Sequence, residues 1–146
     1  MKVFFDTSAL VTAVVDQLPN HAAALVCYRQ HTRSRRGKPE AFCSTHAIAE
    51  CYATLTALPV QRRVAPFEAA RLIEQNFLRH LAVLPLSLAD YEQTITRVSS
   101  LGLASGAVYD ALHVRCAQEA GCSRIITYNT GDFTRLVPAG IEVVTP

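Results

Sequence analysis

Lys2-Val3-Phe4-Phe5-Asp6-Thr7-Ser8 is the stretch of sequence that decides the fold. Residues 2–5 are rich in β-branched and aromatic side chains and suit a short buried strand. The three polar residues that follow offer side-chain oxygens to cap a helix that continues to about residue 15. A strand followed directly by a helix is the repeating unit of a parallel sheet. It also places the carboxylate of Asp6 at the carboxyl end of a buried strand.

The alternation of strand and helix continues along the chain. We expect further strands at residues 41–43, 82–86, 124–128 and 142–144. Helices are expected at residues 21–31, from 44 or 45 to about 58, 67–81, from 87 to about 101, 107–120, and in a short segment to 136. The strand cores are short and continuously apolar, which is typical of a parallel sheet covered on both faces. The sequence therefore predicts a three-layer α/β/α fold in which residues 1–146 form a single domain.

Composition excludes several classes of protein. The chain has 146 residues, of which 50% are hydrophobic and 18% charged, so it can bury a core and is a poor candidate for disorder. Its apolar runs are too short to span a bilayer, and Asp6 interrupts what would otherwise start a signal peptide. We therefore expect a cytoplasmic protein without membrane contact. Five cysteines without a C-x-x-C pair are expected to be reduced, mostly core residues, namely Cys27, Cys43, Cys51, Cys116 and Cys122.

The basic residues are unevenly distributed. The formal net charge is +2, yet five of the fourteen Lys and Arg residues lie in residues 29–38. A basic run of this kind is usually a solvated surface, and contact with nucleic acid is the sharper alternative. The candidates for such contact are Arg33, Arg35, Arg36 and Lys38.

Four carboxylates occupy informative positions. Asp6 and Asp132 each follow a predicted strand, where open parallel sheets build their sites. Asp110 lies in a helix that is apolar on nearly every side, so its charge needs a partner, either an arginine or a bound cation. Glu50 falls off the apolar stripe of its helix and by position alone would face solvent. The plainer interpretation of Asp6 and Asp132 is that each caps a helix.

Other chemistries lack their signatures. The sequence has no P-loop, no G-x-G-x-x-G after the first strand and no H-E-x-x-H, and His46 with Glu50 is an i, i+4 pair too common on helices to carry weight. If the four acids meet at one topological switch point, they form an oxygen-only cluster, which suits Mg²⁺ or Mn²⁺ rather than zinc.

In the blocks that contain these acids, the sequence resembles PIN-domain ribonucleases, most closely the VapC-type toxins of toxin–antitoxin systems. The blocks are Asp-Thr-Ser-Ala-Leu at 6–10, Ala-Glu at 49–50, Tyr-Asp-Ala-Leu-His at 109–113 and Ile-Thr-Tyr-Asn-Thr-Gly-Asp-Phe at 126–133. The resemblance extends from residue 2 to the final strand. It implies a five-stranded parallel sheet, endonucleolytic cleavage of RNA with Mg²⁺ or Mn²⁺, a homodimer and a VapB-like antitoxin as partner.

The resemblance also implies roles for individual residues. The acidic, metal-holding site would consist of Asp6, Glu50, Asp110 and Asp132. Its polar neighbours, which would orient the metal ligands or the scissile phosphate, are Thr7, Ser8 and Asn129. The basic run would then contact RNA. Two other functions stay open, namely a catalytically silent PIN-like module that binds RNA or a protein, and a nuclease of RNA processing or of DNA without a toxin role.

Overall fold

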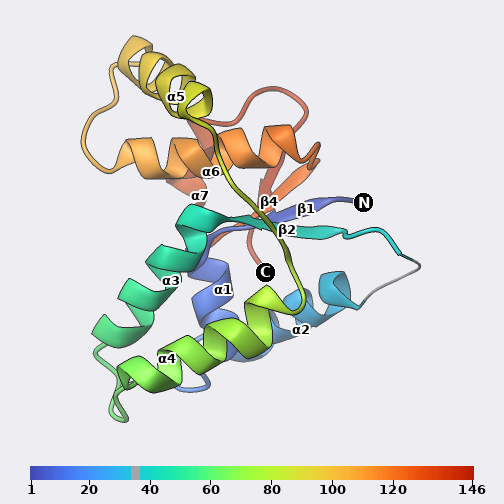
Figure 1. Ribbon diagram of the computed structural model, residues 1–146, viewed down its shortest axis with the longest axis vertical. Coiled ribbons are helices and arrows are strands. Elements are labelled where there is room, and N and C mark those ends of the chain that lie inside the picture. Colours follow the sequence, from blue (N-terminus) through green and yellow to red (C-terminus); the bar gives the residue numbers. More distant parts are fainter. Residues whose placement is uncertain (34–36) are drawn as a thin grey trace.

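Five short parallel strands form the centre of the protein, as the sequence predicts (Figure 1). They are β1 (Val3–Phe5), β2 (Ala41–Ser44), β3 (Ala82–Leu84), β4 (Arg124–Ile126) and β5 (Glu142–Val144). Their order in the sheet is β3-β2-β1-β4-β5, and Val3 pairs with both Ala41 and Arg124. The computed structural model describes residues 1–33 and 37–146.

Helices cover both faces of the sheet, because successive strand side chains point to opposite sides. Val3 and Phe5 of β1 belong to a core cluster with the helices of one layer, whereas Phe4 packs into a second cluster with the other layer. The first layer comprises α1 (Thr7–Val14), α2 (His21–Thr32), α3 (Thr45–Ala57), α4 (Pro66–Leu72) and a π-helix, η1 (Ile73–Leu78). The second comprises α5 (Leu88–Ser100), α6 (Ala107–Glu119) and α7 (Thr130–Thr134). Figure 1 shows the two layers on either side of the strands.

Two helices begin directly where a strand ends. Asp6 is the N-cap of α1 and accepts a hydrogen bond from the backbone N–H of Ser8, and Ser44 is the N-cap of α3 and accepts one from Ala47. Each cap satisfies a backbone donor that the first helical turn leaves without a partner. The amino ends of α1 and α3 therefore lie side by side at the carboxyl edge of the sheet.

Some predicted boundaries were wrong. The predicted strand 82–86 ends at Leu84, since Pro85 lacks the N–H that a ladder needs. The predicted helix 67–81 changes at Ile73 from α-helix to π-helix. Three apolar side chains of α2, α3 and η1, namely Val26, Tyr52 and Leu78, are 43–57% exposed and lie outside the core. The cysteines are all free, and Cys27 alone among the five is only partly buried.

The chain reverses its direction of travel across the sheet at β1. The second and third strands lie on one side of β1, and the fourth and fifth lie on the other. Ligands of open α/β sheets bind in the crevice outside the carboxyl ends of the strands at such a reversal. Among the described residues, the structure contains no helix that is both long and apolar enough to span a membrane.

Candidate active site at the carboxyl edge of the sheet

Asp6 is held at the end of β1 by three donors. Its Oδ2 accepts hydrogen bonds from the backbone N–H of Ser8 (3.2 Å), from Ser8 Oγ (2.7 Å) and from Thr127 Oγ1 (2.8 Å). Thr127 directly follows β4, so the two strands at the reversal point both contribute to this arrangement. The other oxygen, Oδ1, lies 3.8 Å from His113 Nε2. The carboxylate is thus a helix cap, as the plainer interpretation has it, and it also faces the other acids.

Glu50 comes from α3 and is only partly exposed, not solvent-facing as its position on the helix suggests. Its Oε2 accepts hydrogen bonds from Thr7 Oγ1 at 2.6 Å and from His113 Nε2 at 2.9 Å. Burial would raise the pKa of Glu50, but these two donors and the nearby imidazoles outweigh burial and lower it to about 2. Glu50 is therefore ionised throughout the physiological range.

A chain of hydrogen bonds fixes His113, which is fully buried on α6. The backbone N–H of Ala47 donates to Ser44 Oγ (2.9 Å), and Ser44 Oγ lies 3.0 Å from His113 Nδ1. Because the ionised carboxylate of Glu50 can only accept, the imidazole proton that faces it sits on Nε2, while Nδ1 shares the other hydrogen bond with Ser44 Oγ. Both ring nitrogens are used, so His113 orients the carboxylate of Glu50.

Asp110 lies three residues before His113 on α6 and is partly buried. Burial first, and then the negative charges of Asp6, Asp132 and Glu50, raise its pKa to about 6, although His113 acts in the opposite direction. In the described part of the chain its carboxylate has no arginine partner, which removes the salt-bridge interpretation there. Asp110 is the acid whose charge is least compensated.

Asp132 and Asn129 lie at the rim. Asp132, in the first turn of α7, pairs with Arg135 at 2.6 Å, and both side chains are about half exposed. Asn129 is the N-cap of α7, and its backbone N–H donates to Thr127 Oγ1 at 2.9 Å. The negative charge of Asp132 is nevertheless near enough to help raise the pKa of Asp110.

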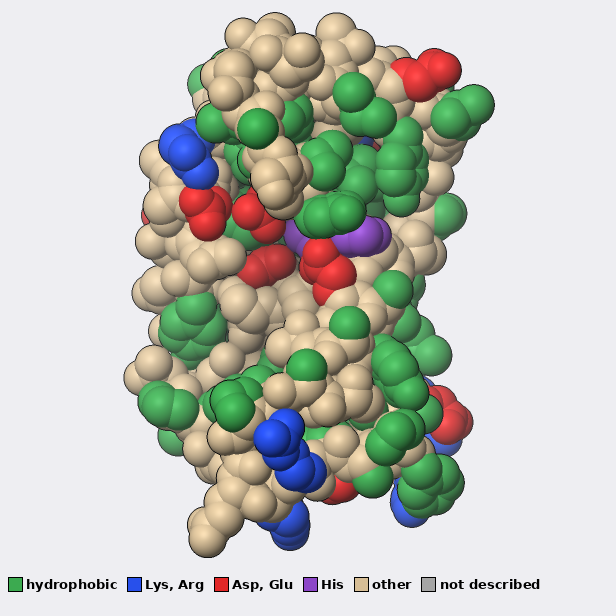
Figure 2. All heavy atoms as spheres, turned by 90° about the vertical axis from the view of Figure 1, so that its left-hand side faces the viewer, with side chains coloured by type: hydrophobic (Ala, Val, Ile, Leu, Met, Phe, Trp, Pro, Cys, Tyr) green, Lys and Arg blue, Asp and Glu red, His purple; other side chains and the backbone are tan. Residues whose placement is uncertain are grey.

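The predicted acids therefore converge, with different degrees of closeness. One ligand atom each from Asp6, Glu50 and His113 lie within 4.8 Å of one another. Asp110 and Asp132 belong to the same electrostatic neighbourhood without being in that tightest group. Figure 2 shows acidic side chains gathered around histidine on one face of the molecule, with one basic side chain beside them and most other Lys and Arg side chains in the lower part of the view.

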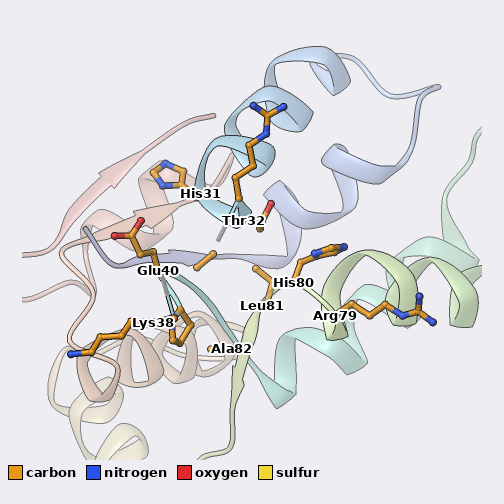
Figure 3. Close-up of a pocket in the computed structure, with 12 residues that line it drawn as sticks. His31, Thr32, Lys38, Glu40, Arg79, His80, Leu81 and Ala82 are labelled. Atoms are coloured by element: carbon orange, nitrogen blue, oxygen red, sulfur yellow. The ribbon is translucent and has the colours of Figure 1, made fainter. Parts of the chain in front are cut away.

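The described residues Arg33 and Lys38 of the basic run lie at the other edge of the sheet. Arg33 and Lys38 line a cavity of about 450 Å³ together with Ala41 and Ala82, the first residues of β2 and β3 (Figure 3). Arg35 and Arg36 lie outside the described residues. Because parallel strands share their direction, this cavity is at the amino edge and the acids are at the carboxyl edge.

Sequence reasoning missed several residues of the site. Two of them, Ser44 and Thr127, lie at the ends of strands as Asp6 does, and that position could have marked them. His113 lies one helical turn after Asp110, but a histidine in an apolar helix carries no sequence signal that separates core packing from a role in the site. His46 lies four residues before Glu50, with Nε2 at 3.0 Å from Glu50 Oε1, and its ring stacks on Tyr109. The i, i+4 pair that carried no weight in the sequence is part of the site.

Comparison with known proteins gives consistent matches. The family model described as PIN domain matches residues 3–137. Ribonuclease VapC27 of Mycobacterium tuberculosis is 35% identical over 114 residues, which are 78% of this chain and 75% of that protein. The crystal structure of VapC20 of M. tuberculosis, described as a Sarcin-Ricin loop cleaving toxin, has a TM-score of 0.71 at 16% identity and covers 91% of this chain and 93% of its own. The structure of VapBC-1 of nontypeable Haemophilus influenzae has a TM-score of 0.63 at 17% identity, and the match covers 99% of this chain and 98% of that chain.

Proposed function

Because the chain belongs to the PIN-domain family, we propose that it is a divalent-metal-dependent endoribonuclease and the toxin of a type II toxin–antitoxin pair. The observation that carries this proposal is the convergence of Asp6, Glu50 and Asp110 at the carboxyl edge, where Asp110 is held in the repulsive field of its neighbours. Its sequence relative is named a ribonuclease, and its structural neighbours include a named toxin and a VapBC assembly. We accordingly propose RNA as substrate, a VapB-like antitoxin as partner, a homodimer, and action in the cytoplasm by one domain spanning residues 1–146.

The residues fit a hard divalent cation. Carboxylate oxygens are the ligands that Mg²⁺ and Mn²⁺ prefer. Burial first, and then the neighbouring negative charges, raise the pKa of Asp110, and a bound positive charge would favour its ionised form. The residues that would hold the ion are Asp6, Glu50, Asp110 and Asp132. When bound, such an ion polarises a phosphate oxygen and lowers the pKa of a water molecule.

The chain's own groups prepare the site for phosphodiester hydrolysis. Three donors occupy Oδ2 of Asp6 and so leave Oδ1 toward the other acids. Thr7 and His113 hold Glu50 ionised and in a fixed orientation. Ser8 Oγ accepts a hydrogen bond from the backbone N–H of Tyr128 at 3.0 Å. This bond connects the first turn of α1 to the segment that follows β4. Preorganised groups of this kind need no reorganisation during the reaction.

Cleavage of total RNA by the purified protein tests the activity. We expect cleavage with Mg²⁺ or Mn²⁺, loss of cleavage in EDTA and recovery when metal is added back. Asp6→Asn should abolish it, whereas Asp16→Asn, the same change at a 70% exposed side chain of the surface, should not. Cleavage that persists in EDTA and survives in Asp6→Asn would refute the metal-dependent site.

Expression in a bacterial host tests the biological role. We expect growth arrest that Asp6→Asn removes and that the neighbouring antitoxin gene suppresses. Cleavage in vitro without growth arrest would instead favour a nuclease of RNA processing. RNA binding without cleavage under any metal would favour the catalytically silent module.

A further inference from the structure

A column of rings runs from the interior to the surface beside the acids. It begins at the buried Phe133, whose ring is nearly parallel to that of His113 at a centroid distance of 6.4 Å. His46 follows, 5.6 Å from His113, and Tyr109 ends the column, 5.2 Å from His46 with the two planes 14° apart. Tyr109 is 49% exposed. The column thus presents one aromatic side chain to solvent on a rigid base.

The column is tied to the acidic site along its length. His113 donates to Oε2 of Glu50, and His46 Nε2 lies 3.0 Å from the other oxygen of the same carboxylate. Tyr109 itself immediately precedes Asp110 in the first turn of α6. An RNA strand that has one of its phosphates at the acids therefore passes close to the Tyr109 ring.

We propose that Tyr109 is a stacking platform for an unpaired nucleobase of the RNA, adjacent to the phosphate that is cut. This inference rests on the proposed function and adds a base subsite to it. A nucleobase is the planar group that every nucleotide carries, and stacking on an aromatic side chain is the common way in which proteins hold single-stranded RNA. Duplex bases have both faces covered by their neighbours, so the subsite takes bases from loops or single strands.

The electrostatics of the site explain why such a platform is useful. Asp6, Glu50, Asp110 and Asp132 repel the phosphate backbone at the point of cleavage. Stacking attracts the substrate without using charge, so it acts where basic side chains would compete for the carboxylates. Its contribution therefore stays nearly constant as salt rises, whereas phosphate contacts weaken. His46, packed beneath Tyr109, fixes the ring before RNA arrives.

Binding measured on two matched oligomers tests the proposal. Protein carrying Asp6→Asn, which prevents cleavage, is titrated with a short oligo(A) and with an abasic ribose-phosphate oligomer of the same length. Tyr109→Leu should weaken oligo(A) binding by about 5- to 150-fold and binding of the abasic oligomer by less than about twofold. Tyr109→Phe should restore oligo(A) binding. The matched control is Tyr91→Leu on α5, where the tyrosine is 37% exposed, and it should change neither affinity.

A spectroscopic readout guards against a merely structural role for Tyr109. The chain contains no tryptophan, so Tyr109→Trp introduces a single reporter whose fluorescence should change with oligo(A) and not with the abasic oligomer. Equal losses for both oligomers in Tyr109→Leu, or no fluorescence change from the introduced tryptophan when oligo(A) is bound, would overturn the base subsite. If the protein with native Asp6 cleaves RNA while its Asp6→Asn form shows these results, the proposed function stands and only the inference is lost. If the Asp6→Asn form binds neither oligomer and the protein with native Asp6 cleaves no RNA, the proposed function itself fails.

Discussion

Replacement of Asp110 by asparagine should stabilise the protein while it abolishes cleavage. Raising a carboxyl pKa from 3.8 to about 6 costs the ionised form about 3 kcal/mol, at ~1.4 kcal/mol for each tenfold change. Asp110 is partly buried, so solvent screens part of this cost, and we expect Asp110→Asn to gain about 1–2 kcal/mol at pH 7.5. In a chain of this size that is about 2–8 °C in Tm.

The stability difference between the wild type and Asp110→Asn should depend on pH. Native Asp110 binds its proton more tightly than the unfolded chain does, so its contribution is fully present below about pH 4 and is lost as pH rises to about 6. The wild type should therefore become less stable than Asp110→Asn as pH rises through this window, and the two proteins should have the same Tm at lower pH. Thermal unfolding in EDTA, followed by circular dichroism from pH 4 to 8, measures the gap.

Two results would refute this reasoning. One is a Tm of Asp110→Asn below that of the wild type at pH 7.5, which would mean that the carboxylate makes a stabilising contact. The other is a gap that does not change with pH. The exposed Asp16→Asn serves as control and should show no comparable dependence on pH. Added Mg²⁺ should stabilise the wild type more than Asp110→Asn, because a ligand stabilises the state that binds it.

The remaining predictions concern the core and the basic run. Phe133→Ala removes a fully buried ring that packs on His113, and should cost about 3–5 kcal/mol in urea unfolding together with lost cleavage; a cost below about 1 kcal/mol would contradict the packing. Neutralising three of Arg33, Arg35, Arg36 and Lys38 should weaken RNA binding across sequences and flatten its salt dependence by roughly one unit of slope per lost phosphate contact. An unchanged affinity and slope would mark the run as a solvated surface or a partner contact.

Local pattern was sufficient for the fold and for some of the acids. The apolar run at residues 2–5 predicts a buried strand of the sheet, and the residue after it, Asp6, is thereby placed at the carboxyl end of that strand. Asp110 was similarly marked, because an acid in an otherwise apolar helix has to be compensated wherever that helix packs. These features survive in the structure because each depends on neighbours in sequence.

Features that depend on distant residues were beyond local pattern. Glu50 lies off the apolar stripe of α3, yet it is held by Thr7 and His113, which come from two other helices. His113 gains its role from Ser44, 69 residues earlier in the chain. An apolar helix gives the same sequence signal whether its histidine fills a core or orients an acid, so only the packing of α6 against β2 and α3 distinguishes the two.

The pKa values of Glu50 and Asp110 shift in opposite directions because the described side chains donate hydrogen bonds to one carboxylate and not to the other. Both carboxylates are partly buried in one acidic neighbourhood, but Glu50 accepts two side-chain hydrogen bonds and has its pKa lowered to about 2. Asp6 likewise has three donors on one oxygen. Asp110 accepts no side-chain hydrogen bond from the residues that the structure describes, and its pKa rises to about 6. Among the described side chains, the fold supplies donors to Glu50 and Asp6 but not to Asp110, so a bound cation would relieve the charge of Asp110 above all.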